Sequence, residues 1–358
     1  MKDSTRIVSS SMAFSMAWLT ISFAFPLLGV KYSLNYTEIG IIGMVSNLSF
    51  GIASASYLKA GASIIGRSLR IIPFLSAFAT VFFMFSSRDT FAYVIGTVSI
   101  VQAFFWISME IYLGYASGTG NAEKYTASWG FPMVFAPILA GAMIQYLGFR
   151  TLFMVGIAFF ITAGFLAPDV EKYKHKDHGE KPSVLIVLPL VFSGIAIGFF
   201  FYVIVPYLKL HGYSYVDIAM IETLFAGIQA LVFFLLNFVR KAKVTVYALI
   251  TAVMSASPLF LIASLSLYLI IPFVIIIAVA SAIGFSKILS YISSTTSPNT
   301  GIFYYETFYA IGFAIGSSFG GFLFEFYRPL SYLIFISPLA YSFLIMPRMR
   351  RKAYETVC

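Results

Sequence analysis

Cysteine and charged residues are scarce in this chain. One of its 358 residues is a cysteine, Cys358, and only 10% of the residues are charged. A lone cysteine excludes an intramolecular disulfide and leaves no cysteine-based metal site. Because an ordinary soluble domain has roughly 25% charged residues, so little charge cannot cover a surface that faces water. We therefore expect most of the chain to lie in a lipid bilayer.

Long apolar segments fill the chain instead. Hydrophobic residues make up 60% of it, with 39 phenylalanines, and the mean hydropathy is +0.91. A helix needs about 20 mostly apolar residues to cross the hydrocarbon core, which is about 30 Å thick. The sequence divides into twelve such segments, at 8–30, 37–58, 70–86, 91–113, 126–147, 151–167, 184–208, 215–239, 244–264, 267–290, 302–325 and 330–346.

The basic residues indicate how these segments are oriented. An even number of spans puts both termini on one side, and Lys and Arg beside spans are biased toward the cytoplasm. With both termini in the cytoplasm, eighteen of the 23 Lys and Arg residues fall on the inner side. The formal charge of +9 is therefore explained by membrane topology, and no nucleic-acid partner is expected. We expect a multi-pass protein of the cell membrane with both termini cytoplasmic.

The two halves of the chain contain matching stretches. Residues 36–39 read Tyr-Thr-Glu-Ile at the start of the second segment, and residues 215–218 read Tyr-Val-Asp-Ile at the start of the eighth, 179 positions later. Residues 140–141 of the fifth segment, Ala-Gly, are matched 180 positions later by Gly-Gly at 320–321 of the eleventh. Offsets close to half the chain length predict a duplicated bundle.

The duplication predicts the fold class and the domains. We expect an all-α membrane protein of twelve transmembrane helices in two pseudo-symmetric six-helix bundles. The bundles are placed at 1–167 and 184–358, and a charged linker at 168–183 joins them in the cytoplasm. His175 and His178 in this linker are two histidines among lysines, which are more often solvated than metal ligands. No metal site and no cofactor are predicted.

One short motif lies between the second and third segments. Residues 59–68 read KAGASIIGRS, and this stretch is similar to the G-x-L-A-D-R-x-G-R-R motif of the major facilitator superfamily. Gly66 and Arg67 fit the motif, whereas Ser63 stands where the family has Asp. The chain therefore lacks, at this position, the Asp that a gating ion pair of the family would use.

A second motif lies in the fifth segment. Residues 136–141 read APILAG, which resembles the G-P-x-x-G-G motif of the antiporters of that superfamily, with alanine in place of two glycines. Pro137, Ala140 and Gly141 carry the resemblance. The alternative interpretation is ordinary close packing of helices at small residues.

The resemblance to the major facilitator superfamily covers essentially the whole chain. It implies two bundles around a central cavity that is lined by helices one, four, seven and ten. It also implies a secondary transporter, and no enzyme is expected because no nucleophile, base and orienting group occur at a suggestive spacing.

Four ionisable residues lie inside the segments, where each costs roughly 2.5–3.5 kcal/mol and so usually faces a cavity or a partner. Glu110 and Lys287 lie toward the cytoplasmic ends of segments four and ten. They either pair across the cavity as a gate that a coupling proton breaks, or reach the lipid headgroups. Glu222 and Glu306 are candidate protonation sites, since a carboxyl group away from water can hold a proton near neutral pH. The alternative for both is a hydrogen bond to a neighbouring helix.

Two further carboxylates, Glu38 and Asp217, lie at the starts of segments two and eight. A carboxylate is favourable at a helix N-terminus. Helix capping therefore explains both residues without further function.

The cavity lining implied by the resemblance is aromatic and weakly polar. No arginine lies deep in any segment, which disfavours phosphate and multiply charged anions because such ligands usually need a fixed bidentate cation. An aromatic, weakly polar lining favours hydrophobic or cationic compounds as substrates. The candidate lining residues are Gln102, Trp106 and Ser108 of segment four, Phe200 and Tyr202 of segment seven, and Ser281, Ser286 and Tyr291 of segment ten.

The sequence thus predicts a monomeric secondary transporter that works by alternating access on a small-molecule substrate and protons. The first hypothesis is multidrug efflux by proton antiport, the export of hydrophobic or cationic compounds. The alternative is an uptake permease for a neutral nutrient such as a sugar or an amino acid. A lipid scramblase or a nutrient sensor on the same scaffold is a hypothesis of another class.

Overall fold

The structure, a computed structural model, describes residues 3–60, 62–115, 121–167, 181–236, 238 and 243–351. Within these residues, twelve helical segments are long and apolar enough to cross a membrane. Each overlaps one of the twelve segments expected from the sequence. The spans are Val8–Lys31, Tyr36–Ser56, Ser63–Phe85, Phe91–Tyr112, Ser128–Leu147, Phe149–Leu166, Val184–Leu210, Tyr215–Leu236, Val244–Ile262, Leu267–Ile292, Asn299–Phe326 and Arg328–Ile345.

The first bundle consists of six α-helices. They are α1 (Asp3–Lys31), α2 (Tyr36–Ser56), α3 (Ala62–Val81), α4 (Phe91–Tyr115), α5 (Asn121–Leu147) and α6 (Phe149–Leu166), with the short 3-10 helix η1 (Phe82–Phe85) after α3.

Most spans of the second bundle are divided into shorter helices. In chain order they are α7 (Val184–Phe199) with η2 (Phe200–Ile204) and α8 (Val205–Leu210); α9 (Tyr215–Leu236); α10 (Val244–Ser255) with η3 (Ser257–Ile262); α11 (Leu267–Ile283) with η4 (Gly284–Ile288) and α12 (Leu289–Thr295); α13 (Pro298–Ala314) with η5 (Ile315–Phe319) and α14 (Gly320–Phe326); and α15 (Arg328–Ser331) with η6 (Tyr332–Phe335) and α16 (Ile336–Arg351).

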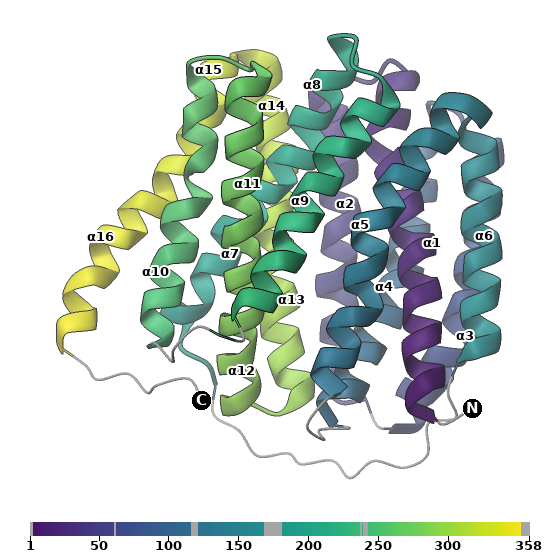
Figure 1. The fold of residues 1–358 in the computed structure, drawn as a ribbon, viewed down its shortest axis with the longest axis horizontal. Coiled ribbons are helices and arrows are strands. Elements are labelled where there is room, and N and C mark those ends of the chain that lie inside the picture. Colours follow the sequence, from purple (N-terminus) through teal and green to yellow (C-terminus); the bar gives the residue numbers. More distant parts are fainter. Residues whose placement is uncertain are drawn as a thin grey trace.

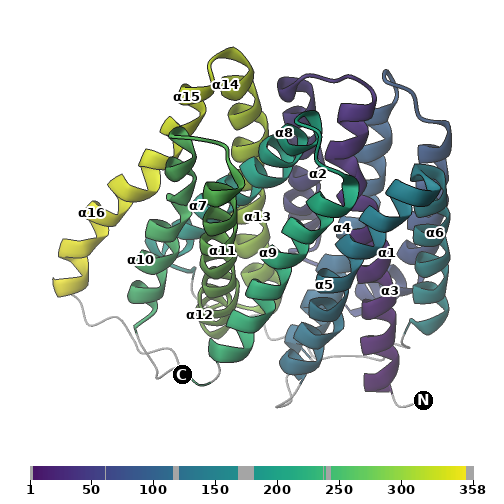
Figure 2. The same cartoon turned by 45° about the horizontal axis from the view of Figure 1, so that its top comes forward.

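The two bundles lie side by side (Figure 1, Figure 2). In the first, α1 packs against α5 and α6, and α3 packs against α4 and α6. In the second, α7 packs against α10 and α13, and α11 packs against α9. Between the bundles, α2 contacts α13 and α14, α5 contacts α9, and α1 contacts α8. The expected all-α fold of twelve spans in two six-helix bundles is therefore confirmed.

The ends of the molecule are named here by their position in Figure 1. The lower end is where α1 and α13 begin, and the upper end is where α8 is followed by α9. The predicted linker, 168–183, and its histidines His175 and His178 lie mostly or wholly outside the described residues, so the domain boundaries stay a prediction.

The starts of α2 and α9 are fixed by reciprocal hydrogen bonds. At α2, the Glu38 amide donates to Asn35 Oδ1 at 2.8 Å and the Asn35 amide donates to Glu38 Oε2 at 2.9 Å. At α9, the Asp217 amide donates to Ser214 Oγ at 3.1 Å and the Ser214 amide donates to Asp217 Oδ2 at 2.9 Å. Such boxes satisfy the free amides of a helix start, which confirms the capping role predicted for Glu38 and Asp217.

The third span begins earlier than the sequence predicts. We expected it to begin at residue 70, whereas α3 begins at Ala62 and its apolar span at Ser63. Gly66 and Arg67 therefore lie on α3, Gly66 buried and Arg67 exposed, and not in a loop. Arginine side chains at the end of a span can reach the interface with their charged groups, so basic residues do not stop the helix.

The helices α7 and α13 approach each other through glycines. A Cβ atom built on Gly312 would lie 2.0 Å from the Val191 carbonyl oxygen, and one on Gly316 would lie 2.0 Å from that of Ile195. On the other helix, a Cβ on Gly194 would lie 2.5 Å from the Tyr309 carbonyl oxygen. Small residues four apart let helix backbones pack closely in lipid, where van der Waals contact drives association.

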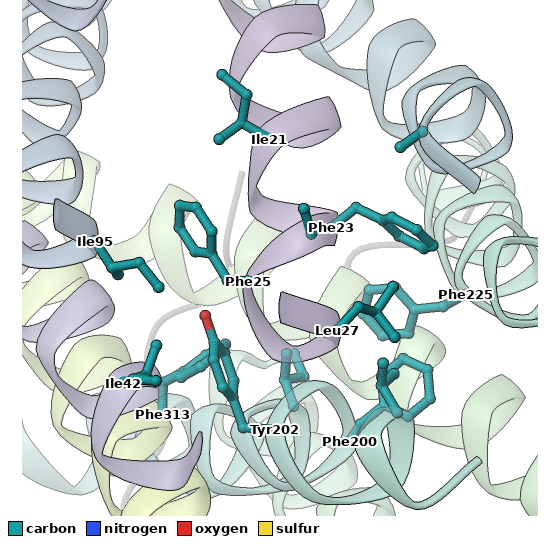
Figure 3. Packing of buried hydrophobic residues seen from close by; sticks show 14 of the residues in the cluster. Ile21, Phe23, Phe25, Leu27, Ile42, Ile95, Phe200, Tyr202, Phe225 and Phe313 are labelled. Atoms are coloured by element: carbon teal, nitrogen blue, oxygen red, sulfur yellow. The ribbon is translucent and has the colours of Figure 1, made fainter. Parts of the chain in front are cut away.

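Buried aromatic side chains pack in both bundles near their contact. Figure 3 shows Phe25 of α1, Phe200 and Tyr202 of η2, and Phe225 of α9. Phe25 packs on Phe83 within the first bundle, with centroids 5.5 Å apart, and Phe200 packs on Phe225 within the second, with centroids 5.9 Å apart. Tyr202 reaches the other bundle, where its ring lies against Gly43 of α2.

Candidate functional site

A cavity of about 300 Å³ lies between the bundles. Its lining comes from α1, α2, α4 and α5 of the first bundle and from α7, η2, α9, α11, η4 and α13 of the second. Twelve of its 27 lining residues are aromatic. The only charged residues among the lining residues that the structure describes are three glutamates, Glu110, Glu222 and Glu306.

Two of these glutamates meet across the bundles. Glu110 of α4 and Glu306 of α13 lie close enough to interact electrostatically, and Glu306 is 8% exposed. Tyr305 and Tyr309 belong to the same lining. Two carboxylates this close repel each other, so a proton on either of them stabilises the pair. The pair is therefore a place where one proton can be held between the two bundles.

The third glutamate, Glu222 of α9, has no such partner. It is 5% exposed, and its Oε1 atom makes no hydrogen bond within the described part of the chain. One turn and two turns further along α9, Ala226 and Gln229 also line the cavity, as expected for residues that share a helix face. Gln229 Nε2 donates to Ser281 Oγ of α11 at 2.9 Å.

Tyr202 is held by the first bundle although it belongs to the second. Its ring lies against Gly43 of α2, where a Cβ would be only 2.6 Å from the ring. Tyr202 and its neighbour Phe201 both line the cavity. Both belong to the π-helical turn η2, and such turns are frequent at functional sites.

The predicted site residues divide into two groups. Seven of them line the cavity: Glu110, Glu222, Glu306, Trp106, Tyr202, Ser281 and Pro137. Gln102, Ser108 and Phe200 are buried outside the lining, and Ser286, Tyr291 and Lys287 are partly buried outside it. Helix geometry explains the difference for Ser108, which follows Trp106 by two residues and so faces the other side of α4. Its hydroxyl donates to the Phe104 carbonyl at 2.7 Å.

Lys287 does not meet Glu110 in this structure. Its Nζ atom donates to the Leu236 carbonyl at 3.2 Å, at the end of α9, and lies 5.7 Å from the centre of the Tyr247 ring. Lys287 follows the cavity residue Phe285 by two positions, so it points to another side of the span. Pairing with Glu110 would require another conformation of the two bundles.

The fifth-span motif lies at a contact between the bundles. A Cβ built on Gly141 would lie 2.4 Å from the Ala219 Cβ of α9, and Ala140 is fully buried. This favours the close-packing interpretation of residues 136–141. Pro137 lines the cavity from the same helix.

Sequence reasoning missed several lining residues, in part because it sought the cavity lining on spans one, four, seven and ten. The structure adds residues from spans two, five, eight and eleven. An uncharged polar residue inside an apolar span was the available signal for Asn47 and Gln229. The main residues missed are Trp18, Asn47, Trp129, Gln229, Phe285, Tyr305 and Tyr309.

No family model matches this sequence, and a search of curated proteins gives no match. The fold is similar to that of several solved transporters. A bacterial homologue of the human lysosomal transporter Spinster, inward-facing and occupied, matches with TM-score 0.68 and 13% identity over 94% of this chain and 95% of that one. The nucleoside transporter NupG matches with TM-score 0.69 and 11% identity over 98% and 100%.

A transporter of the POT family in complex with 5-aminolevulinic acid matches with TM-score 0.76 and 8% identity, over 96% of this chain and 95% of that one. These structures are of the major facilitator type. The fold expected from the sequence resemblance is thus the fold that the structure has.

Proposed function

We propose that this protein is a secondary transporter that exports hydrophobic or cationic small molecules in exchange for protons. The observation that carries the proposal is the cavity between the bundles, which is aromatic and has three glutamates as its charged lining residues. A cavity of this size can enclose a small organic molecule. Rocking of the two bundles about such a site is the mechanism of alternating access.

The charge of the lining supports the substrate class. Carboxylates attract cations and repel anions, and no lysine, arginine or histidine occurs among the described lining residues. An anionic substrate would meet three acidic groups with no basic group to bind it. Aromatic rings add apolar contact and attract cations through their faces.

The Glu110–Glu306 pair supports proton coupling. Its two members come from α4 and α13, which belong to different bundles. When both carboxyl groups lose their protons, they repel each other and the contact between the bundles weakens. Binding or release of one proton thereby changes the stability of the contact between the bundles. A proton exchanger requires such a link between protonation and conformation.

The alternative is a permease that takes up a neutral nutrient. Asn47, Gln229 and Ser281 place amide and hydroxyl groups in the same cavity, and these groups can bind a sugar or a nucleoside. The similarity of the fold to the nucleoside transporter NupG agrees with this alternative.

We also propose that the protein is a monomer in the plasma membrane and that its lower end faces the cytoplasm. The placement of the basic residues supports this orientation, because most of them flank the spans on that side.

Proteoliposomes that contain a pH-sensitive dye test the proposal. Addition of tetraphenylphosphonium should move protons across the membrane in vesicles with the wild-type protein. Glu306→Gln should reduce this movement at least tenfold, whereas Asp89→Asn, which changes an exposed carboxylate, should leave it unchanged. Accumulation of labelled uridine or sugar without proton movement on addition of the cation would favour the alternative.

A further inference from the structure

We propose that Glu222, with Tyr202, Phe201 and Phe225, forms a subsite for the charged nitrogen or phosphorus centre of an organic cation, distinct from the Glu110–Glu306 pair. The inference rests on the proposed transport function and assigns the recognition of substrate charge to one glutamate. Proton exchange is then left to the pair.

Glu222 is a buried carboxyl group with no basic residue beside it in the described lining. It is 5% exposed, Oε1 makes no hydrogen bond to any described residue, and no basic residue of the described lining approaches it. An ionised carboxylate in an apolar site costs several kcal/mol unless it takes up a proton or is joined by a cation or a hydrogen-bond donor. A cationic substrate supplies that partner when it enters the cavity.

Aromatic rings line the cavity together with this carboxylate. Phe201 and Phe225 both line the cavity, with centroids 5.8 Å apart and ring planes at 82°. Tyr202 interacts electrostatically with Glu222. Ring faces attract cations within about 6 Å of the centroid, so we expect the rings and the carboxylate to act on the same ligand charge. Figure 3 labels Tyr202 and Phe225 in this region.

The π-helical turn η2 presents two consecutive side chains to the cavity. In a regular α-helix, neighbouring residues point about 100° apart. Phe201 and Tyr202 both line the cavity from η2, as the consecutive residues Tyr305 and Glu306 do from α13. Span seven thus contributes two neighbouring aromatic rings to the lining at this point.

Glu222 and the pair lie at different depths. Glu222 is seven residues from Tyr215, where α9 begins at the upper end, and Glu306 is eight residues from Pro298, where α13 begins at the lower end. At 1.5 Å per residue, each lies about 10–12 Å along its helix from that end. The two acidic sites therefore lie at different depths of the same cavity.

Tryptophan fluorescence gives a direct measure of ligand binding. The chain has three tryptophans, and all of them, Trp18, Trp106 and Trp129, line the cavity. Tetraphenylphosphonium and its neutral relative triphenylphosphine oxide can be titrated against the full-length protein in lipid nanodiscs. Their dissociation constants are then compared between variants.

Glu222→Gln should weaken tetraphenylphosphonium binding at least tenfold and change triphenylphosphine oxide binding less than twofold. Glu222→Asp should keep part of the cation affinity, because the charge remains. Glu306→Gln should weaken cation binding less than threefold, and Asp89→Asn should have no effect. A size-exclusion profile and a melting curve for each variant confirm that it is folded.

Three results would overturn the inference. The first is equal weakening of the cation and the neutral ligand by Glu222→Gln, which assigns the residue a role in cavity shape only. The second is a larger loss of cation affinity in Glu306→Gln than in Glu222→Gln. The third is absence of quenching by the cation at saturating concentration in the wild type. Charge-dependent binding at Glu222 without proton movement in vesicles would instead support this subsite and refute the proton exchange.

Discussion

The Tyr36 amide at the start of α2 donates a hydrogen bond of 2.8 Å to Glu325 Oε2 on α14. The Tyr215 amide at the start of α9 donates in the same way to Gln145 Oε1 on α5, at 3.2 Å. The two donors are 179 positions apart and the two acceptors are 180 positions apart. The repeat in the sequence therefore appears in the structure as two equivalent contacts between the bundles.

Glycines bring the same helices close together. A Cβ built on Gly321 would lie 2.4 Å from the Tyr36 carbonyl oxygen, and one on Gly141 would lie 2.7 Å from the Tyr215 carbonyl oxygen. The starts of α2 and α9 are thus each held by one glycine and one side-chain acceptor from the other bundle. We call these two contacts the upper latches.

Glu325→Ala should loosen one upper latch. Loss of a hydrogen bond worth about 1 kcal/mol shifts a two-state equilibrium about fivefold. Spin labels at Tyr93→Cys and Tyr268→Cys, in a Cys358→Ser background, report the distance between the bundles at the upper end. Both positions are strongly exposed, 78% and 90%. We expect a larger population at long distances in Glu325→Ala than in the parent.

The control for this latch is Glu325→Gln, whose amide oxygen can still accept from Tyr36 as Gln145 does from Tyr215. It should behave like the parent. Gln145→Ala should have a smaller effect of the same sign, because its hydrogen bond is longer and uncharged. Identical distance distributions in Glu325→Ala and the parent would show that this hydrogen bond does not hold the bundles together at the upper end.

Gly316→Ala should destabilise the second bundle. Its new methyl group would lie 2.0 Å from the Ile195 carbonyl oxygen, a backbone atom that cannot move aside without shifting α7. Overpacking of this kind costs about 1–3 kcal/mol. Gly227→Ala is the matched control, since a Cβ there meets no atom within 4 Å. Thermal unfolding in detergent should show a lower midpoint for the first variant only, and equal midpoints would contradict the close approach of α7 and η5.

The effects of Glu110→Gln and Glu306→Gln on proton-driven transport should not be additive. Because the two carboxyl groups interact with each other, either substitution disrupts the pair, and residues that act as a unit show strong coupling. Each single variant should lose at least tenfold in proton-driven transport, and the double variant should lose no more than a further twofold. Transport rates in proteoliposomes at several pH values measure this. Wild-type rates and pH dependence in Glu110→Gln would exclude that residue from coupling.

Lys287→Met should lower the stability of the protein and leave the proton coupling of transport nearly unchanged. Its ammonium group donates to the Leu236 carbonyl, and loss of this charge-assisted bond costs about 1.5–3 kcal/mol. The unfolding midpoint should fall, while the pH profile of transport stays near that of the wild type. A pH profile changed in the same way as in Glu110→Gln would instead indicate that the two residues pair during the transport cycle.

The sequence alone determined the number of spans, their approximate limits, their duplication and the fold that follows from it. These features depend on local properties, because an apolar stretch of sufficient length must form a helix in lipid to satisfy its backbone groups. The caps at Glu38 and Asp217 were predictable for the same reason, since they involve residues three positions apart.

Only the tertiary structure decided which ionisable groups meet. From the sequence, a Glu110–Lys287 pair was one of two alternatives because the two residues occupy corresponding spans. The structure places Glu110 beside Glu306 of another span and turns Lys287 toward α9. Partner choice depends on the rotation of each helix about its axis, and a shift of one residue rotates a side chain by about 100°. The π-helical turns at η2, η4 and η5 add such shifts in spans seven, ten and eleven. Hydropathy does not record helix rotation, so the cavity lining and the isolation of Glu222 became visible only after the bundles were packed together.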